Sequence, residues 1–254
     1  MLLAIDVGNT NVTFGVFENE DLRATWRMAT DVYKMPDEYA ISMISMLRHE
    51  GLETSDITGA ALCSTVPPLI STVEELLQRY FGLTPLVVSP GVKTGVRIRM
   101  DNPKEVGPDR IANTAAAHHL YKGPAIVVDV GTATTFDVVS REGDFIGGVI
   151  ATGIGTAAEA LFQRAAALPR IELVAPKRAI GTGTITAMQS GIVFGYVALV
   201  EGMVARIQRE LGEKATVVAT GGYADVIAAE TSVFDTVNPD ITLIGLRQIY
   251  LMNA

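Results

Sequence analysis

The sequence predicts an α/β protein made of two similar halves, and three observations support this class. Segments typical of buried strands alternate with amphipathic helical patterns along the whole chain. The turn Asp6-Val7-Gly8-Asn9-Thr10 follows an apolar strand, and Asp129-Val130-Gly131-Thr132-Ala133 does the same about half a chain length later. Apolar residues make up 48% of 254 residues, which is enough to bury a sizeable core. We therefore expect an internal duplication.

Five strands are expected in the first half from alternating or continuous apolar runs. They lie at about residues 2–5, 12–16, 22–28, 57–63 and 86–88. A first helix is expected from Pro36 until Gly51, and a second is indicated by the capping-box spacing of Ser71 and Glu74. A loop over residues 89–107 leads to a third helix at about 108–121.

The second half repeats this order. Its strands are expected at residues 125–128, 136–139, 145–150 and 216–219. One helix is expected to begin at Thr156, which has capping-box spacing to Glu159, and a long helix is expected over residues 186–211. Two more helices are expected at about 223–230 and from about 241 onward. We divide the chain into domains at residues 1–115 and 116–254.

Charge and cysteine content narrow the function classes. Twenty basic and twenty-eight acidic side chains give a net charge of −8, which disfavours nucleic acid as a partner. The single cysteine, Cys63, lies in an apolar strand, and a chain with no possible internal disulfide fits a reducing cytoplasm. The N-terminal apolar run is interrupted by Asp6, and the run over residues 192–200 is short for a bilayer, so we expect no leader and no membrane contact.

The two aspartate turns carry the main chemical signal. Each places a carboxylate at the end of a buried strand, next to a glycine and to neutral hydroxyl or amide side chains. Gly8 and Gly131 allow close approach of a phosphate to the backbone, and the carboxylate suits its cation. An ordinary turn is the alternative, because Asp, Gly and Asn favour turns. The recurrence of the pattern in both halves favours a phosphate site.

Two other glycine patterns are weaker. The segment from Gly153 to Ala158 matches G-x-G-x-x-A and opens a helix, but its preceding strand follows a tight turn at Gly143 and is therefore expected to be antiparallel. This disfavours a dinucleotide site. The segment Gly181-Thr182-Gly183-Thr184 lacks the lysine of a P-loop, and Thr184 is kept as a contact to a polar substrate.

The most charged segment is residues 101–110. Asp109 and Arg110 lie in the first turn of the expected helix, where they can act as a carboxylate base beside a guanidinium that holds an anion. We expect the helix N-terminus and Arg110 to keep Asp109 ionised. The alternative is an acidic helix cap with a solvated arginine. The three histidines, His49, His118 and His119, have no partner at catalytic or ligand spacing, and we assign them no chemistry.

With these residues in view, the chain resembles the type III pantothenate kinases of the acetate kinase, hexokinase, Hsp70 and actin superfamily. The resemblance covers the whole length. It rests on the two aspartate turns, Ser64-Thr65-Val66-Pro67, Asp101-Asn102-Pro103, Gly107-Pro108-Asp109-Arg110, Gly147-Gly148 with Gly153, Gln189-Ser190-Gly191 and Thr220-Gly221-Gly222. It implies two ribonuclease H-like (actin-like ATPase) domains, ATP with Mg²⁺ in the cleft between them, and a homodimer that phosphorylates the 4′-hydroxyl of pantothenate for coenzyme A synthesis.

The resemblance also implies roles for individual residues. The first phosphate loop would comprise Asp6, Val7, Gly8, Asn9, Thr10, Asn11, Val12 and Thr13, with Thr132 as a second nucleotide contact. Asp109 would be the catalytic base. Pantothenate would contact Gly107, Pro108, Asp109, Arg110 and Thr184. Asp129 would bind a monovalent cation, K⁺ or NH4⁺, and Asp6 would approach the Mg²⁺ of the nucleotide. Thr220-Gly221-Gly222 would lie on the adenosine side.

Some residues depart from the family pattern. Met100 stands where many members have Tyr, Thr152-Gly153 replaces the usual Pro-Gly, and Gly107-Pro108 replaces the commoner Gly-Ala. Gly183 stands where many relatives have Asn. None of these changes removes a charged group that the chemistry requires. Two alternatives stay open: a nucleotide-binding accessory protein without catalysis, and a phosphatase or another small-molecule kinase of the same superfamily.

The expected helix over residues 186–211 indicates how the chain assembles. It carries apolar residues on more than one face, and a monomer could hide only part of that surface. We therefore expect a two-fold homodimer that uses this helix.

Overall fold

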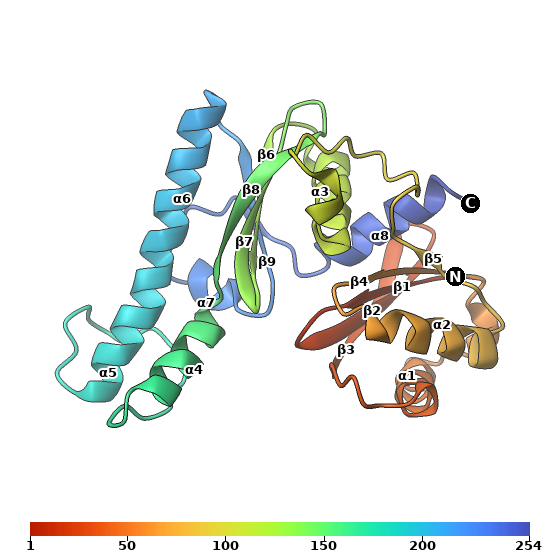
Figure 1. Cartoon of the computed structure of the whole chain (residues 1–254), viewed down its shortest axis with the longest axis horizontal. Helices are drawn as coiled ribbons and strands as arrows, with labels where there is room; N and C mark the ends of the chain where they lie inside the picture. Colours follow the sequence, from red (N-terminus) through yellow and green to blue (C-terminus); the bar gives the residue numbers. More distant parts are fainter. The chain divides into compact units, whose positions relative to one another are not determined.

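The computed structural model describes residues 1–254, which form two compact units (Figure 1). The first unit comprises Met1–Val96, Asn102–Ala116 and Thr242–Ala254, and the second comprises Arg97–Asp101 and Ala117–Ile241. Each unit contains one five-stranded mixed sheet. The predicted α/β class with two similar halves is confirmed. The C-terminal residues 242–254 belong to the first unit by their contacts, whereas the sequence division placed them in the second domain.

The first sheet has the strand order β3-β2-β1-β4-β5. Its strands are β1 (Leu2–Val7), β2 (Asn11–Glu18), β3 (Asp21–Ala29), β4 (Gly59–Ser64) and β5 (Leu86–Val87). β1, β2 and β3 are antiparallel, whereas β4 and β5 run parallel to β1. Because β1 and β4 are parallel neighbours, both of their carboxyl ends lie at one edge of the sheet.

Helices cover both faces of this sheet (Figure 1). α1 (Pro36–His49) and α2 (Pro68–Phe81) pack on the face that carries Leu3 and Ile5. α3 (Pro108–Tyr121) and α8 (Ile241–Leu251) pack on the opposite face. Ala4, Ala61 and Cys63 line that second face, as expected from the alternation of side chains along a strand. α3 and α8 approach closely, because a Cβ on Gly245 would lie 1.9 Å from the carbonyl oxygen of Ala112.

The second sheet has the order β10-β9-β6-β7-β8, which is the same arrangement as the first. Its strands are β6 (Ala125–Val130), β7 (Ala133–Val139), β8 (Phe145–Thr152), β9 (Thr216–Thr220) and β10 (Thr236–Val237). β6 corresponds to β1 and β9 to β4, with the same antiparallel and parallel neighbours. The duplication inferred from the two aspartate turns is thus visible in the topology. The two-residue strand β10 is too short to show in the sequence pattern.

The second unit carries four helices and one π-helical turn. They are α4 (Ile154–Arg164), α5 (Thr184–Gln189), the π turn Ser190–Phe194, α6 (Gly195–Leu211) and α7 (Ala224–Ala228). α6 lies along the sheet and packs through Val197, Val200 and Val204. The continuous run Thr184–Leu211 is long and apolar enough to cross a membrane by length and composition, a test that core helices of soluble proteins also pass.

Two of the predicted helix starts are wrong. α2 begins at Pro68 rather than at Ser71, and the Ser71 hydroxyl donates to the Pro68 carbonyl inside the first turn. The fixed φ of proline suits a first helical turn and moves the start toward the N-terminus. α4 begins at Ile154 rather than at Thr156, whose hydroxyl donates instead to the carbonyl of Thr132 at 2.8 Å. This capping-box residue therefore supports the second aspartate loop.

Candidate active site

The first aspartate turn joins β1 to β2 and presents donors rather than acceptors. Its backbone closes with a hydrogen bond from the Gly8 amide to the Asn11 carbonyl at 2.9 Å. The Thr30 hydroxyl donates to the Gly8 carbonyl at 2.6 Å, and the Thr30 amide donates to the Thr10 carbonyl at 2.9 Å. The Val7 carbonyl accepts from the amide of Thr65 at 2.9 Å. These carbonyl oxygens are therefore engaged within the protein.

The side chains of this turn are suited to an anion. Asn9, Thr10 and Asn11 are exposed, and their amide and hydroxyl groups can donate hydrogen bonds without adding negative charge. Gly8 has little room for a larger residue, since a Cβ there would lie 3.2 Å from the Asn11 carbonyl oxygen. The loop predicted from sequence thus has the composition and the backbone of a phosphate-binding turn.

Asp6, Cys63 and Asp109 form a cluster in the first unit. Asp6 and Cys63 are directly paired in the parallel ladder of β1 and β4. The Cys63 thiol, which is completely buried, donates to Asp6 Oδ1 at 3.1 Å. Burial and, after it, the nearby charges of Asp6 and Asp109 raise the pKa of this thiol well above its ordinary value. The cysteine therefore stays protonated and can act as a donor.

Asp109 lies in the first turn of α3, and its Oδ1 accepts from the backbone amide of Arg110 at 2.9 Å. A Cβ on Gly107 would lie 2.4 Å from the same Oδ1 atom, so this glycine makes room for the carboxylate. Burial raises the pKa of Asp109, while the Arg110 amide and the Arg110 charge oppose the rise. The sequence indicates the helix N-terminus and Arg110 as the influences on this carboxyl, and the structure adds desolvation, which outweighs them in the direction of the shift.

The segment before Asp109 is fixed to the edge of the second sheet. The Arg99 amide donates to the Phe145 carbonyl at 2.8 Å, and the Phe145 amide donates to the Arg97 carbonyl at 2.9 Å. Asp144, which is buried, pairs with the guanidinium of Arg99. Met100, which replaces the common tyrosine, has its sulfur 3.8 Å from the place where a Cβ of Gly147 would lie. The chain that leads into the Asp109 segment is therefore held by both backbone and side chains.

The second aspartate turn lies in a tight cradle of glycines in the second unit. A Cβ on Gly221, whose φ is +93°, would lie 2.4 Å from Asp129 Oδ1. A Cβ on Gly131 would lie 3.2 Å from the same atom, and one on Gly153 would lie 2.2 Å from the Gly131 carbonyl oxygen. Small residues at all three positions therefore allow the three loops to meet around the Asp129 carboxylate.

Hydrogen bonds fix the position of Thr132 in this cradle. The Thr132 carbonyl accepts from the Gly153 amide at 3.1 Å as well as from the Thr156 hydroxyl. From α6, the Tyr196 hydroxyl donates to the Thr152 carbonyl at 2.8 Å and lies 3.2 Å from the Gly153 carbonyl oxygen. Burial raises the pKa of Tyr196, which keeps the hydroxyl protonated. Through Tyr196, α6 thus holds the Thr152-Gly153 loop, and the Gly153 amide of this loop holds the Thr132 carbonyl.

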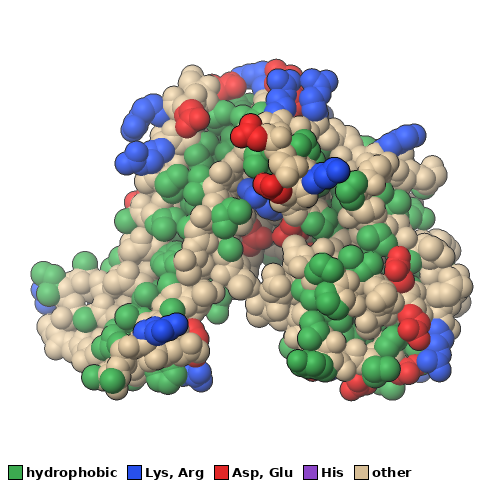
Figure 2. Space-filling view, viewed as in Figure 1, with side chains coloured by type: hydrophobic (Ala, Val, Ile, Leu, Met, Phe, Trp, Pro, Cys, Tyr) green, Lys and Arg blue, Asp and Glu red, His purple; other side chains and the backbone are tan.

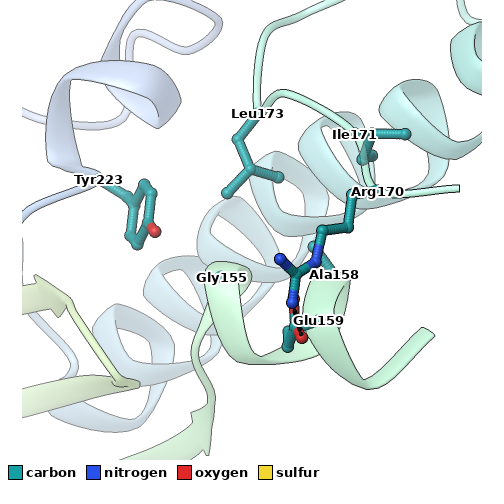
Figure 3. A pocket seen from close by; sticks show the side chains of 7 residues that line it. All are labelled: Gly155, Ala158, Glu159, Arg170, Ile171, Leu173 and Tyr223. Atoms are coloured by element: carbon teal, nitrogen blue, oxygen red, sulfur yellow. Dashed lines mark hydrogen bonds and ion pairs between the residues drawn. The ribbon is translucent and has the colours of Figure 1, made fainter. Parts of the chain in front are cut away.

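A cavity of about 300 Å³ lies beside this cradle, within the second unit (Figure 3). It is lined by Gly155, Ala158, Glu159, Arg170, Ile171, Leu173 and Tyr223. Arg170 forms an ion pair with Glu159 at 2.8 Å, and this pairing lowers the pKa of Glu159. Tyr223 follows the Gly221-Gly222 pair and faces the opposite wall (Figure 3). The lining thus combines apolar side chains with polar ones, and its two charged groups are paired with each other.

Thr184 lies elsewhere in the second unit, exposed at the first position of α5. Two side chains of the helical segment hold the loop that precedes Thr184. The side-chain amide of Gln189 donates to the Glu172 carbonyl at 3.1 Å, and the Ser190 hydroxyl donates to the Ala179 carbonyl at 2.6 Å. These two residues belong to the Gln189-Ser190-Gly191 motif. The motif therefore fixes the loop that leads to Thr184.

Comparison with known proteins identifies the family. The profile of the type III pantothenate kinases matches residues 2–206. The chain belongs to this family. A type III pantothenate kinase of Dehalococcoides mccartyi (strain CBDB1) is 54% identical over 252 residues, covering 99% of this chain and 96% of the relative. The enzyme of the same name from Moorella thermoacetica is 51% identical, with complete coverage of both chains.

Solved structures of low sequence identity share the fold. The activator of the 2-hydroxyisocaproyl-CoA dehydratase from Clostridium difficile superposes with a TM-score of 0.56 at 11% identity, covering 99% of this chain and 94% of that one. The inorganic polyphosphate/ATP-glucomannokinase from Arthrobacter gives a TM-score of 0.50 at 14% identity, covering 99% and 98%. This member of the family thus has the two-domain fold of the actin-like ATPases and sugar kinases.

The type III pantothenate kinases are soluble biosynthetic enzymes that use ATP with a divalent metal ion, and the donor set fits such a substrate. No group of three or more His, Cys, Asp and Glu side chains is arranged so that it could hold a metal ion by itself. Asp6 and Asp129 instead each lie at the start of a phosphate-type turn, one in each unit. Such hard oxygen donors suit a cation that is shared with a nucleotide rather than enclosed by the protein.

Several residues with clear local roles were missed by sequence reasoning. Cys63 was expected to be only a small buried hydrophobe, yet its thiol donates to Asp6. Asp144 and Tyr196 support the two segments that carry the motifs, from distant parts of the chain. Nothing in the local pattern of these three residues could have shown this, because each contact depends on tertiary packing.

Proposed function

We propose that this chain transfers the γ-phosphoryl group of ATP to the 4′-hydroxyl of pantothenate, the first step of coenzyme A synthesis. Family membership at 51–54% identity over the whole chain supports the activity. The structural observation that carries the mechanism is the half-buried Asp109 carboxylate, which lies near Cys63, as Asp6 does, in one compact unit. Phosphoryl transfer needs positioning and neutralisation of charge rather than a covalent nucleophile, and these residues can supply both.

Within this proposal, residues 6–13 hold the phosphates through backbone amides and through the neutral side chains of Asn9, Thr10, Asn11 and Thr13. Thr132 provides a second contact. Mg²⁺ that arrives with ATP offsets the charge that develops on the phosphoryl oxygens. Asp6 is the residue of the first loop that approaches this ion.

Asp109 accepts the proton of the 4′-hydroxyl as the phosphoryl group is transferred. Its raised pKa suits this role, since the ionised form of a carboxyl with a higher pKa is a stronger base. Arg110 provides the positive charge for the carboxylate of pantothenate. Gly107, Pro108 and Thr184 complete the contacts to this substrate.

The second loop is proposed to bind a monovalent cation, K⁺ or NH4⁺. Asp129 is the last residue but one of β6, whose other residues are buried, and the turn after it carries only neutral side chains. A charge of +1 balances the carboxylate without the strict octahedral shell that Mg²⁺ demands. The cavity lined by Tyr223 and Leu173, beside the Thr220-Gly221-Gly222 segment, is proposed to accept the adenosine end of ATP.

A homodimer that uses the α5–α6 helix is also proposed. Only 22% of the most apolar 18-residue window of this helix is buried, and hydrophobic side chains lie along it in the space-filling view (Figure 2). Gly191, Gly195 and Gly202 are exposed, and no atom lies within 4 Å of where their Cβ atoms would be. Such positions allow another helix to approach closely, and a second copy of the chain supplies one.

Light scattering tests the dimer. Wild-type protein at micromolar concentration is expected to show twice the chain mass of 27.0 kDa, and Gly195→Leu is expected to shift it toward one chain mass. A wild-type mass of one chain would contradict the proposal.

We further propose that the protein acts in the cytoplasm and that its folding domains are residues 1–115 and 116–254, although residues 242–254 contact the first unit.

One assay separates the proposed reaction from its alternatives. Purified protein is incubated with Mg²⁺, ATP and K⁺, with and without pantothenate, and ADP is measured. Release of ADP that depends on pantothenate supports the kinase. Release without pantothenate would indicate a hydrolase, and no release would indicate a nucleotide-binding accessory protein.

A further inference from the structure

The proposed mechanism gives no role to the buried thiol of Cys63, which lies near Asp6 and Asp109. It is completely buried at the carboxyl end of β4 and belongs to the core between the sheet, α3 and α8. A purely apolar residue could fill this space. The thiol nevertheless points at the Asp6 carboxylate, with Sγ and Oδ1 3.1 Å apart.

The pairing of the strands explains this contact. Asp6 and Cys63 are directly opposite each other in the parallel ladder of β1 and β4, so their side chains lie next to each other on the same face of the sheet. Asp6 is the last residue but one of its strand, at the edge where the phosphate-type turn begins. A donor at position 63 therefore reaches one carboxylate oxygen from the protein interior.

The second half of the chain repeats this arrangement. Asp129 is paired in the parallel ladder of β6 and β9 with Thr220, which is 3% exposed. Both loop aspartates are thus paired with a buried residue that carries a hydroxyl or a thiol. In a duplicated fold, a side chain that only fills space would be free to become alanine or valine. The recurrence of a hydrogen-bonding group favours a role that involves the carboxylate.

We propose that Cys63 is a positioning residue for Asp6. Its thiol holds Oδ1 from the buried side and thereby directs the other oxygen toward the turn, where the metal ion of the nucleotide is proposed to bind. This inference rests on the proposed role of Asp6. A hydrogen bond to a charged group also restricts the rotamers of a short carboxylate side chain, which lowers the entropy lost when the nucleotide binds.

Binding of Mg²⁺-ADP, measured by calorimetry on the full-length protein, gives a readout that does not require turnover. Cys63→Ala is expected to weaken this binding by about three- to tenfold, the range for loss of one hydrogen bond. Cys63→Ser retains a donor of similar size and is expected to stay within about twofold of wild type. In steady-state kinetics, Cys63→Ala is expected to raise the KM for ATP more than the KM for pantothenate.

If Cys63 only fills space in the core, Cys63→Ser is not expected to bind Mg²⁺-ADP more tightly than Cys63→Ala. Serine places a hydroxyl in an apolar core, so it would be no better than alanine if packing alone mattered. Val88→Ala is the matched control, because Val88 belongs to the same core cluster and its side chain has no donor to offer Asp6. It is expected to lower the melting temperature without changing the dissociation constant of Mg²⁺-ADP. If Cys63→Ala does not fold, Cys63→Val removes the donor while filling the space.

Asp6→Asn separates failure of this inference from failure of the proposed function. If Asp6→Asn binds Mg²⁺-ADP as wild type does, the proposed role of Asp6 is wrong. If Asp6→Asn loses binding while Cys63→Ala and Cys63→Ser bind equally, only the positioning role is overturned. In the double variant, Cys63→Ala is expected to add no further loss, because the two residues act through one interaction.

Discussion

Replacement of Asp109 by Asn is the sharpest test of the proposed chemistry. Asparagine keeps the shape of the side chain, and its carbonyl oxygen can still accept from the Arg110 amide, which lies 2.9 Å from Oδ1. It cannot accept the proton of the substrate hydroxyl. Loss of a general base costs about 10²–10⁴-fold in kcat, which corresponds to about 2.7–5.5 kcal/mol of transition-state stabilisation.

The burial of Asp109 sets the direction of two further effects. Because burial raises its pKa, the acidic limb of the wild-type kcat/KM profile is expected at a higher pH than for an ordinary aspartate. A carboxyl whose folded-state pKa is raised stabilises the fold below its unfolded pKa, and this contribution is lost as the pH rises through the folded-state pKa. Above the folded-state pKa the ionised Asp109 is therefore a cost to stability, and Asp109→Asn is expected to melt there at or above the wild-type temperature.

The assay combines pH-dependent kinetics with thermal melts and Mg²⁺-ADP binding on the one variant. A large loss of kcat, a flattened acidic limb, unchanged nucleotide binding and undiminished stability are expected together. The helix-cap alternative predicts near-normal turnover and little change in stability, because Asn caps a helix about as well as Asp. A folded Asp109→Asn protein that keeps more than about a tenth of wild-type kcat would refute the reasoning, since general-base loss is larger than that.

Three further predictions concern the second loop. Activity in Na⁺ alone should be much lower than in K⁺ or NH4⁺ if Asp129 binds a monovalent cation, and equal initial rates in the three salts would rule this out. Gly221→Ala should lower the melting temperature by at least about 2–4 °C, because the change strains a φ of +93° and crowds Asp129, whereas Gly222→Ala has open space and should not. Tyr196→Phe should raise the KM for ATP with little change in the KM for pantothenate. The reason is that the Tyr196 hydroxyl supports the Thr152-Gly153 loop beside Thr132. An unchanged KM for ATP would show that Tyr196 does not support the nucleotide site.

Local sequence patterns were sufficient to predict most of the fold. The paired aspartate turns led to the duplication, and the two sheets have the same strand order. Alternation and apolar runs located β1, β2, β6 and β7, because each buries one face or both faces in a core. The starts of α2 and α4 were wrong, because capping-box spacing alone does not show whether a serine or threonine hydroxyl is used inside the helix or by another loop.

The electrostatics of the site could not be predicted from local sequence. Arg110 and the helix N-terminus are visible in the sequence next to Asp109, and both favour the charged form. The burial that outweighs them comes from packing of distant segments around α3, which no neighbouring residue reveals. The same limit applies to Cys63, since its partner Asp6 is far away in the sequence and is brought beside it by the parallel ladder.

The most direct test of the central claim is to identify the product. Protein, ATP, Mg²⁺, K⁺ and pantothenate are incubated together. The phosphorylated product is identified by ³¹P nuclear magnetic resonance and mass spectrometry, and the amount of ADP is measured. We predict one phosphate monoester on the 4′-oxygen for each ADP released, with formation of both nearly abolished in Asp109→Asn. ADP that appears without phosphorylated pantothenate, or phosphorylated pantothenate formed at the wild-type rate by Asp109→Asn, would contradict it.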